Sequence, residues 1–188
     1  MKKCRGFTLV ELLVVVAVIF ILASLFIPSA GSLIDRSKAA KICANQKNLQ
    51  SGCIAHYTDT GRYAYEVDVT ESGVGVNEHQ LSMRQTYGGW AGPYMDRPLN
   101  WNDNPFNQDI DIGQDLSTWA GNFDLDRNGS LEAVGPGNLI IMQGIPDTAA
   151  LRVDAALDGT GPGSWRDRGQ VKMIWGNWMA LYLVGGNR

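Results

Sequence analysis

The feature that most constrains the fold is an apolar run near the N-terminus. From residue 12 to residue 27 every side chain is aliphatic or aromatic except Ser24, which carries the only hydroxyl group. A short leader with three basic residues and no acid precedes the run, and Glu11 stands at its start. A carboxylate in a bilayer costs about 3 kcal/mol. We therefore expect Glu11 to have a partner or a function.

The segment around the leader differs from an ordinary secretory signal, in which a small-residue cleavage site follows the apolar core. Here residues 28–31, Pro-Ser-Ala-Gly, lead directly into more helix-compatible sequence. The candidate cleavage site lies before the core, at Gly6. The residues Gly6-Phe7-Thr8-Leu9-Val10-Glu11 resemble the type IV prepilin signal, a glycine followed by F-T-L-x-E. Type IV pilins and type II secretion pseudopilins share this signal.

The resemblance implies roles for four residues. In that family prepilin peptidase cleaves after the glycine and methylates the new N-terminal residue, so Gly6 and Phe7 are the expected processing residues. The glutamate that matches Glu11 pairs with the free amine of Phe7 on a neighbouring subunit during assembly, and this pairing offsets the cost of burying both charges. Pro28 lies where many members carry a helix-kinking proline. A plain signal anchor with a chance glutamate is the alternative.

Length and charge predict the topology. Residues 7–27 are about long enough to cross the hydrocarbon core of a membrane. Positive charge before the run predicts a cytoplasmic N-terminus, with the following residues in the periplasm or outside the cell. The localisation implied is the bacterial inner membrane, followed by a filament after assembly. Cleavage would change the net charge from −3 to −6, and we expect no nucleic-acid partner for so acidic a chain.

One long helix is predicted from about Thr8 to Thr60. Its second half has apolar residues at helical spacing and polar residues between them, and Gly61 suits the left-handed position after its end. We expect a leader at 1–6, a transmembrane and assembly helix at 7–30, an amphipathic continuation at 31–60 and a globular head at 61–188. The fold class is α+β and pilin-like, with the helix packed on a small antiparallel sheet.

The head is predicted to be irregular in its first half, where glycine, asparagine, aspartate and tryptophan are frequent. The expected elements are a short strand at 65–69, a helical turn or two at 81–87, a strand at 138–141, a helix at 147–157, and strands at 170–175 and 178–184. Gly176-Asn177 between the last two is typical of a two-residue hairpin turn.

A tryptophan-rich stretch refines the resemblance. Residues 90–106 are similar to the W-x-G-P-Y-[LM] and P-x-x-W-x-x-P-[FY] motifs of the major pseudopilin of type II secretion. The matching residues are Trp90, Gly92, Pro93, Tyr94, Met95, Pro98 and Trp101, and Pro105 and Phe106 follow Trp101 one residue later than in the motif. Asn100 replaces the aspartate that usually precedes the second tryptophan. The stretch favours the pseudopilin branch.

An acidic loop is the candidate metal site. Alternating oxygen-bearing residues before a glycine can converge on one Ca²⁺. Asp124, Asp126 and Asn128 would contribute side-chain oxygens, Ser130 its carbonyl, and Glu132 a ligand through water. The bidentate glutamate of an EF-hand is missing, so the loop is either a simpler calcium site or a solvated Asp-Asn-Gly turn. A nearby aspartate could complete the site; the candidates are Asp109, Asp111 and Asp115.

Catalytic motifs are absent from the sequence, and we do not expect an enzyme. His56 is interpreted as a packed or solvated helix residue. Charges near the C-terminus are interpreted as surface residues around a loop; they are Asp154, Asp158, Arg166 and Asp167. Cys43 and Cys53 lie ten residues apart on one predicted helix, roughly 15 Å by helical rise, which is too far for a disulfide within the chain.

The predicted function is that of a structural subunit of a type II secretion pseudopilus or a type IV pilus-like filament. Its expected partners are prepilin peptidase, other pilin or pseudopilin subunits, and the inner membrane. The first alternative is a minor or tip pilin whose tryptophan-rich head binds a surface ligand. A membrane-tethered enzyme is the weakest alternative, because the chain offers few catalytic groups.

Overall fold

The computed structural model describes residues 7–117, 122–159, 166 and 168–187, and only the backbone of residues 25–30 and Asn187. The chain divides into two compact units, Met1–Ser37 and Lys38–Arg188. The boundary lies inside the first helix, α1 (Leu9–Thr60), which begins and ends within a residue of the predicted positions. Its end is followed by Gly61 at φ 68°, as predicted for a left-handed residue.

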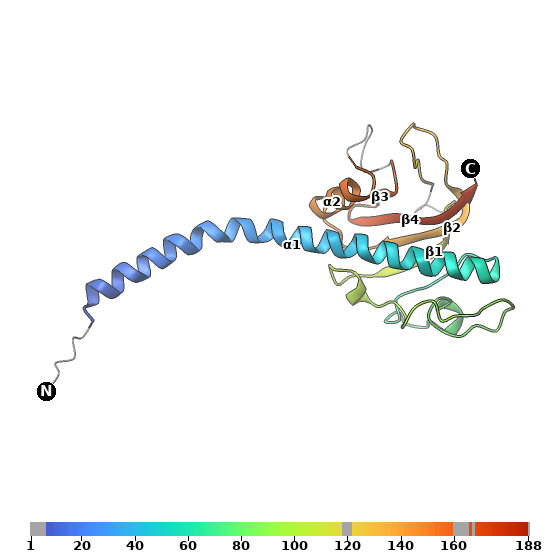
Figure 1. Cartoon of the computed structure of the whole chain (residues 1–188), viewed down its shortest axis with the longest axis horizontal. Coiled ribbons are helices and arrows are strands. Elements are labelled where there is room, and N and C mark those ends of the chain that lie inside the picture. The colour runs from blue at the N-terminus through green and yellow to red at the C-terminus, as the bar shows by residue number, and fades with distance from the viewer. Residues whose placement is uncertain (1–6, 118–121, 160–165, 167, 188) are drawn as a thin grey trace. The chain divides into compact units, whose positions relative to one another are not determined.

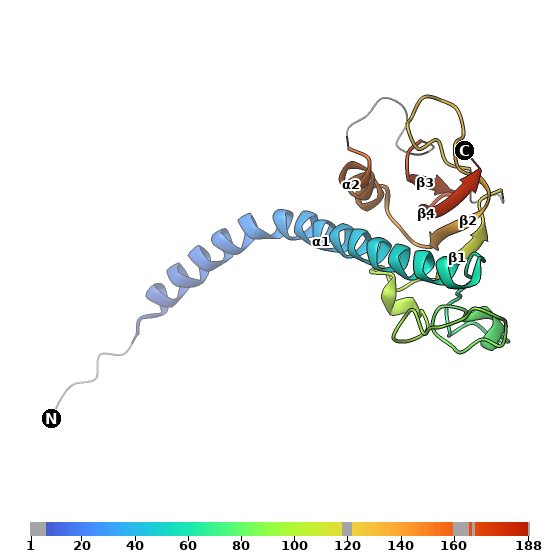
Figure 2. The ribbon, with the colours of Figure 1, turned by 45° about the vertical axis from the view of Figure 1, so that its right-hand side comes forward.

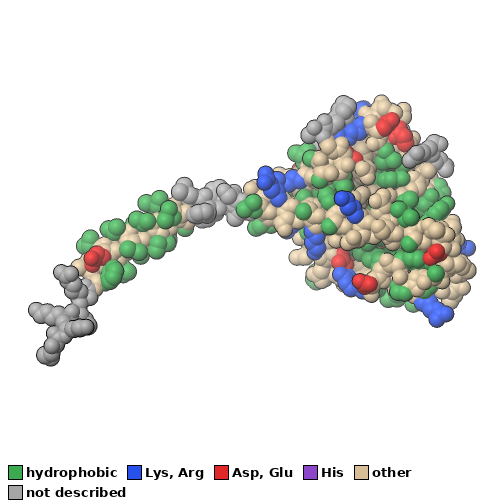
Figure 3. Space-filling view, viewed as in Figure 1, with side chains coloured by type: hydrophobic (Ala, Val, Ile, Leu, Met, Phe, Trp, Pro, Cys, Tyr) green, Lys and Arg blue, Asp and Glu red, His purple; other side chains and the backbone are tan. Residues whose placement is uncertain are grey.

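The first unit is helical and apolar. Every described side chain from Phe7 to Ser24 is exposed, and large hydrophobic residues predominate among them. Figure 3 shows these hydrophobic side chains along the described part of this unit. Among the described residues, no helix combines the length and the apolar character that a membrane crossing requires.

The second unit contains a four-stranded antiparallel sheet with the strand order β1-β2-β4-β3. The strands are β1 (Ile110–Asp115), β2 (Val134–Met142), β3 (Val171–Ile174) and β4 (Trp178–Asn187). The helix α2 (Asp147–Leu157) follows β2 and coincides with its predicted range. Two short 3₁₀ helices, Val76–Glu78 and Trp101–Asp103, lie in the segment before the sheet. The α+β class is therefore confirmed.

The second half of α1 lies between the sheet and the loop-rich segment 61–108 (Figures 1 and 2). Two of its apolar residues, Ile42 and Cys53, are fully buried. On the sheet side, Gln46 and Gln50 donate side-chain hydrogen bonds to backbone carbonyls of β4, at 3.1 and 2.6 Å. On the other side, Asn45 donates to the carbonyl of Asp103 at 2.8 Å. Polar residues of the amphipathic half thus tie the helix to both layers.

Three predicted details of the head were wrong. The hairpin between β3 and β4 has a three-residue connection, because Trp175 adopts a φ of 35° and leaves the strand. The segment 81–87 forms turns and no helix, and Leu81 accepts backbone hydrogen bonds from residues 94 and 95. Residues 65–69 contribute only isolated bridges, from Glu66 to Ile112 and to His79. In the second and third cases a contact distant in sequence outweighs the local pattern.

Candidate functional site

The N-terminus of α1 is closed by a reciprocal cap between Thr8 and Glu11. The backbone N–H and the hydroxyl of Thr8 donate to Glu11 Oε2 at 2.9 and 2.8 Å. The N–H of Glu11 donates in return to Thr8 Oγ1 at 3.2 Å. This is the capping box of a threonine followed three residues later by a glutamate. It satisfies N–H groups that the first helical turn leaves unpaired.

The capping box places Glu11 beside the predicted processing site. Phe7, next to Thr8, is 81% exposed. Gly6 lies outside the described residues, and so does the side chain of Pro28, whose backbone is part of α1. The structure therefore describes two parts of the predicted assembly site. They are an exposed Phe7 and the Glu11 carboxylate, which is hydrogen-bonded to Thr8 of the same helix.

The predicted metal loop is closed at its neck by backbone hydrogen bonds between Phe123 and Ala133. Within it, one carboxylate oxygen from each of Asp124, Asp126 and Glu132 lies within 4.8 Å of the others. Asp124 is only 3% exposed. Its Oδ2 accepts the N–H of Gly129 at 2.9 Å, whereas its buried Oδ1 has no hydrogen-bond partner. An unsatisfied buried carboxylate oxygen is costly, and a cation would satisfy it.

Asn128 and Ser130 lie on the exposed side of the same loop. The Asn128 amide donates to Asp126 Oδ2 at 2.7 Å, and its Oδ1 accepts the Ser130 N–H at 2.7 Å. Carboxylate, amide and carbonyl oxygens are the ligands that Ca²⁺ prefers. The residues of the loop therefore fit a calcium ion.

The additional aspartates considered from the sequence lie in other local groups. Carboxylate oxygens of Asp109 and Asp111 gather with one of Glu71 within 4.8 Å. Burial, with Asp109 as the next cause, raises the pKa of Asp111 to about 7. Asp115 instead accepts hydrogen bonds from the N–H and hydroxyl of Ser117. These residues form a separate acidic group and a local turn.

Asp154 and Asp158 were expected at the surface, and the structure corrects this. Asp154 is buried on α2 and pairs with Arg127 of the predicted metal loop. Asp158 accepts the backbone N–H of Gln170 at 2.8 Å. Arg166 is exposed as predicted, and Asp167 lies outside the described residues. The sequence gives no strong signal for this pairing, because the partners are distant and joined only by the fold.

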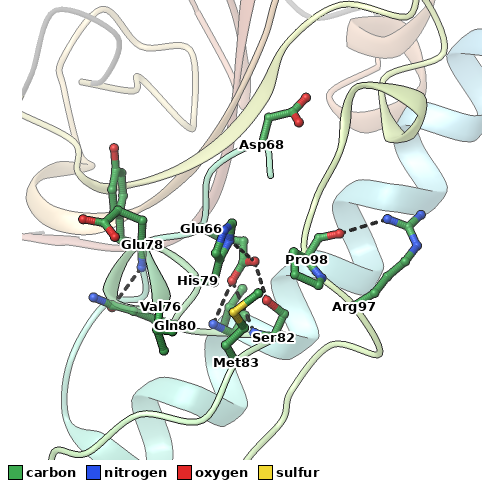
Figure 4. Close-up of polar contacts among 12 residues, drawn as sticks. Glu66, Asp68, Val76, Glu78, His79, Gln80, Ser82, Met83, Arg97 and Pro98 are labelled. Carbon is green, nitrogen blue, oxygen red and sulfur yellow. Dashed lines mark hydrogen bonds and ion pairs between the residues drawn. The ribbon is translucent and has the colours of Figure 1, made fainter. Parts of the chain in front are cut away.

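A second cluster that sequence reasoning missed has Glu66 at its centre (Figure 4). Glu66 Oε1 accepts from His79 Nδ1 at 3.2 Å and from the Ser82 hydroxyl at 2.6 Å. Glu66 Oε2 accepts the N–H of Leu81 at 2.9 Å. Burial raises the pKa of Glu66, although these hydrogen bonds act in the opposite direction.

The composition of this cluster resembles a catalytic triad, but its geometry does not. In a triad the histidine activates the serine and the carboxylate orients the histidine. Here His79 and Ser82 both donate to the one carboxylate, and Glu66 and His79 are 0% and 2% exposed. The backbone of Glu66 also pairs with Ile112 of β1. The cluster therefore fastens the segment 79–82 to the sheet.

Comparison with known proteins identifies the N-terminal motif. Residues 1–27 match the family model described as the prokaryotic N-terminal methylation motif. The N-terminal segment of the chain is therefore similar to that of type IV prepilin-like proteins.

A curated relative extends this result beyond the motif. The chain is 40% identical over 60 residues to the type IV major pilin protein PilA of Myxococcus xanthus (strain DK1622). The match covers 32% of this chain and 27% of that pilin, so it spans about a quarter of the relative's length. No solved structure is significantly similar to the chain.

Proposed function

We propose that this chain is a structural subunit of a pilin-like filament that is processed by prepilin peptidase and assembled from the inner membrane. The observation that carries the proposal is the prepilin motif, with Glu11 next to an exposed Phe7 at the start of an apolar helix. In this proposal residues 7–27 are held in the membrane before assembly and pack against other subunits afterwards. Transfer of apolar residues from lipid to protein is nearly neutral, so packing and polar pairing determine the register.

The capping box suggests how Glu11 behaves before assembly. Its carboxylate is hydrogen-bonded to Thr8 of the same chain, which lowers the cost of an unpaired charge near lipid. Pairing with the Phe7 amine of a neighbouring subunit then adds a charged partner. We propose that this pair selects the correct stagger between subunits.

The type of filament is part of the proposal. The W-x-G-P-Y stretch around Trp90 and Tyr94 supports a type II secretion pseudopilus, whereas the similarity to a major pilin supports a type IV pilus-like fibre. The alternative of a minor tip subunit is favoured by two tryptophans, Trp101 and Trp175, that are 52% and 64% exposed. Immunogold labelling distinguishes a tip subunit from a major subunit, because a tip subunit is labelled at one end of the filament and a major subunit along its whole length.

Processing is tested by intact-mass measurement and N-terminal sequencing of the protein from native membranes. Loss of residues 1–6 and a methylated Phe7 are expected.

Assembly is tested with Glu11→Ala, which is expected to be cleaved normally and to be absent from filaments. Thr8→Ser keeps the capping hydroxyl and serves as the control. Normal filaments from Glu11→Ala would refute the assembly role.

We also propose that the loop of Asp124, Asp126, Asn128, Ser130 and Glu132 binds Ca²⁺. The unpartnered buried Oδ1 of Asp124 and the convergence of three carboxylates support this proposal. Bound calcium would neutralise the carboxylates and hold the loop closed. Calorimetric titration of the full chain in detergent is expected to show binding that Asp124→Asn abolishes. A titration without heat, together with an unchanged melting temperature, would refute it.

A further inference from the structure

Two arginines contact the proposed calcium loop, and their surroundings differ. Arg127 belongs to the loop, but its side chain leads away from the carboxylates and is 8% exposed. Arg168 precedes β3 in the sequence, and its side chain is 39% exposed. The two residues carry the same charge, so their positions determine what each does to a cation in the loop.

Arg127 anchors the loop. Its Nη2 lies 2.6 Å from Oδ1 of Asp154 on α2, and its Nη1 donates to the carbonyl of Gly159 at 3.3 Å. The residue itself has a φ of 63°, which turns the chain between Asp126 and Asn128. The Asp154 carboxylate on α2 already balances the charge of Arg127, so Arg127 competes little with a cation for the loop carboxylates.

Arg168 faces the loop carboxylate that is least exposed. Its Nε lies 3.8 Å from Oδ2 of Asp124, and its Nη1 lies 3.5 Å from the carbonyl of Arg127, to which it donates. Asp124 is also the residue whose Oδ1 lacks a partner. The guanidinium therefore brings one positive charge to the edge of a group of three carboxylates.

We infer that Arg168 is an internal competitor for the cation of this loop, a residue that sets the affinity of the site without ligating the ion. This inference rests on the proposed calcium site. Without a divalent ion, Arg168 partly neutralises Asp124 and limits the repulsion among Asp124, Asp126 and Glu132. A bound Ca²⁺ takes over that role and repels the guanidinium. The half-exposed side chain can then turn toward solvent.

Removal of the charge is expected to have opposite effects on cation binding at the two arginines. Removal of the charge at position 168 eliminates a competitor and leaves the loop anchored through Arg127. Removal of Arg127 leaves Asp154 buried without its partner and loosens the loop from α2, so it is expected to weaken cation binding. If Arg168 had a purely structural role, substitution of either Arg168 or Arg127 would weaken Ca²⁺ binding.

The experiment is a Ca²⁺ titration by calorimetry on the full chain in detergent, at low and at physiological salt. Arg168→Gln is expected to lower the Kd about fivefold, the scale of one partly exposed charge pair, and more at low salt. Arg168→Lys keeps the charge and is expected to keep the wild-type Kd. The matched control is Arg166→Gln, which removes an exposed arginine that pairs with Asp147, away from the loop.

The outcomes separate this inference from the calcium proposal. Tighter binding by Arg168→Gln, with unchanged Kd values for Arg168→Lys and Arg166→Gln, supports the competitor role. An unchanged or higher Kd for Arg168→Gln, while the wild type binds and Asp124→Asn does not, overturns the inference alone. Absence of Ca²⁺ binding by every variant overturns both. Filament formation, which depends on Phe7 and Glu11, is measured independently.

Discussion

Arg127 Nη2 and Asp154 Oδ1 lie 2.6 Å apart, and the two side chains are 8% and 6% exposed. This buried ion pair joins the loop 124–132 to α2. Asp158 adds a second carboxylate to the pair, 3.8 Å from Arg127 Nη2. Gly169, at φ 91°, packs so closely against Asp158 and Arg127 that a Cβ there would clash with Asp158. The contact therefore sets the position of three separate segments.

Asp154→Asn is expected to lower the free energy of unfolding by about 3 kcal/mol, because it removes the nearer carboxylate from the buried Arg127 and leaves only Asp158, 3.8 Å away. Urea denaturation of the full chain in detergent measures the change. The control is Asp147→Asn on the same helix, where the aspartate is exposed and pairs with Arg166. Such a surface pair contributes about 1 kcal/mol or less. Equal effects of the two variants would contradict the distinction.

Asp111 is expected to make the stability of the head depend on pH. Burial raises its folded pKa to about 7, and Asp109, Glu71 and Asp68 add negative charge nearby. The folded state therefore holds the proton more tightly than the unfolded state, whose pKa is about 4. The resulting stabilisation is complete below pH 4 and is lost as the pH rises to 7.

Asp111→Asn should remove this dependence, because an amide has no proton to lose in that range. The melting temperature of the variant is expected to exceed that of the wild type at pH 8. The exposed Asp96→Asn serves as the control. A difference between Asp111→Asn and wild type that is the same at pH 4 and pH 8 would show that Asp111 does not titrate in this way.

His56 is expected to stabilise the end of α1 in its neutral form. It donates from Nδ1 to the carbonyl of Arg62 at 2.9 Å, so Nε2 accepts the Tyr87 hydroxyl at 2.7 Å. Burial lowers the pKa of His56. Its contribution is therefore present above the unfolded pKa of about 6.5 and is lost as the pH falls below it.

Tyr87→Phe removes the hydroxyl that donates a hydrogen bond to His56 Nε2. The loss is expected to lower the free energy of unfolding by about 1–3 kcal/mol at pH 8. Tyr65→Phe is the control, because the Tyr65 hydroxyl makes no hydrogen bond to a described residue. NMR of the His56 ring tests the tautomer directly. Protonation at Nε2 in place of Nδ1 would reverse the assignment of donor and acceptor.

Cys53 and Cys43 should differ in reactivity. Both are free, as predicted from their helical spacing; Cys53 is fully buried and Cys43 is half-buried. Burial raises the pKa of both thiols, and only the thiolate is reactive. A maleimide is expected to label Cys43 slowly and to spare Cys53 until the protein is unfolded. Peptide mass analysis with Cys43→Ser as a control measures this, and rapid native labelling of Cys53 would contradict its burial.

The elements that sequence reasoning predicted best are those with local signals. The helix α2 follows the breaker Pro146 and matches its predicted range, and α1 follows the long proline-poor pattern to Gly61. The strand β1 was missed because its residues pair with β2 and with the distant Glu66, and neither partner is evident locally. Trp175 left its predicted strand for a local reason, because it adopts a positive φ in the hairpin turn.

The candidate sites also differ in whether contiguous residues or the tertiary structure reveal them. Recognition of the N-terminal segment needs only contiguous residues, Gly6 to Glu11 and the apolar run after them, because a peptidase and a membrane act on local chemistry. The oxygen-rich spacing from Asp124 to Glu132 was also evident in the sequence. What the tertiary structure alone decided is which charged residues are buried, among them Glu66, Asp154 and Asp124. Burial depends on segments distant in sequence that cover a side chain, and the resulting desolvation determines its partners and its pKa.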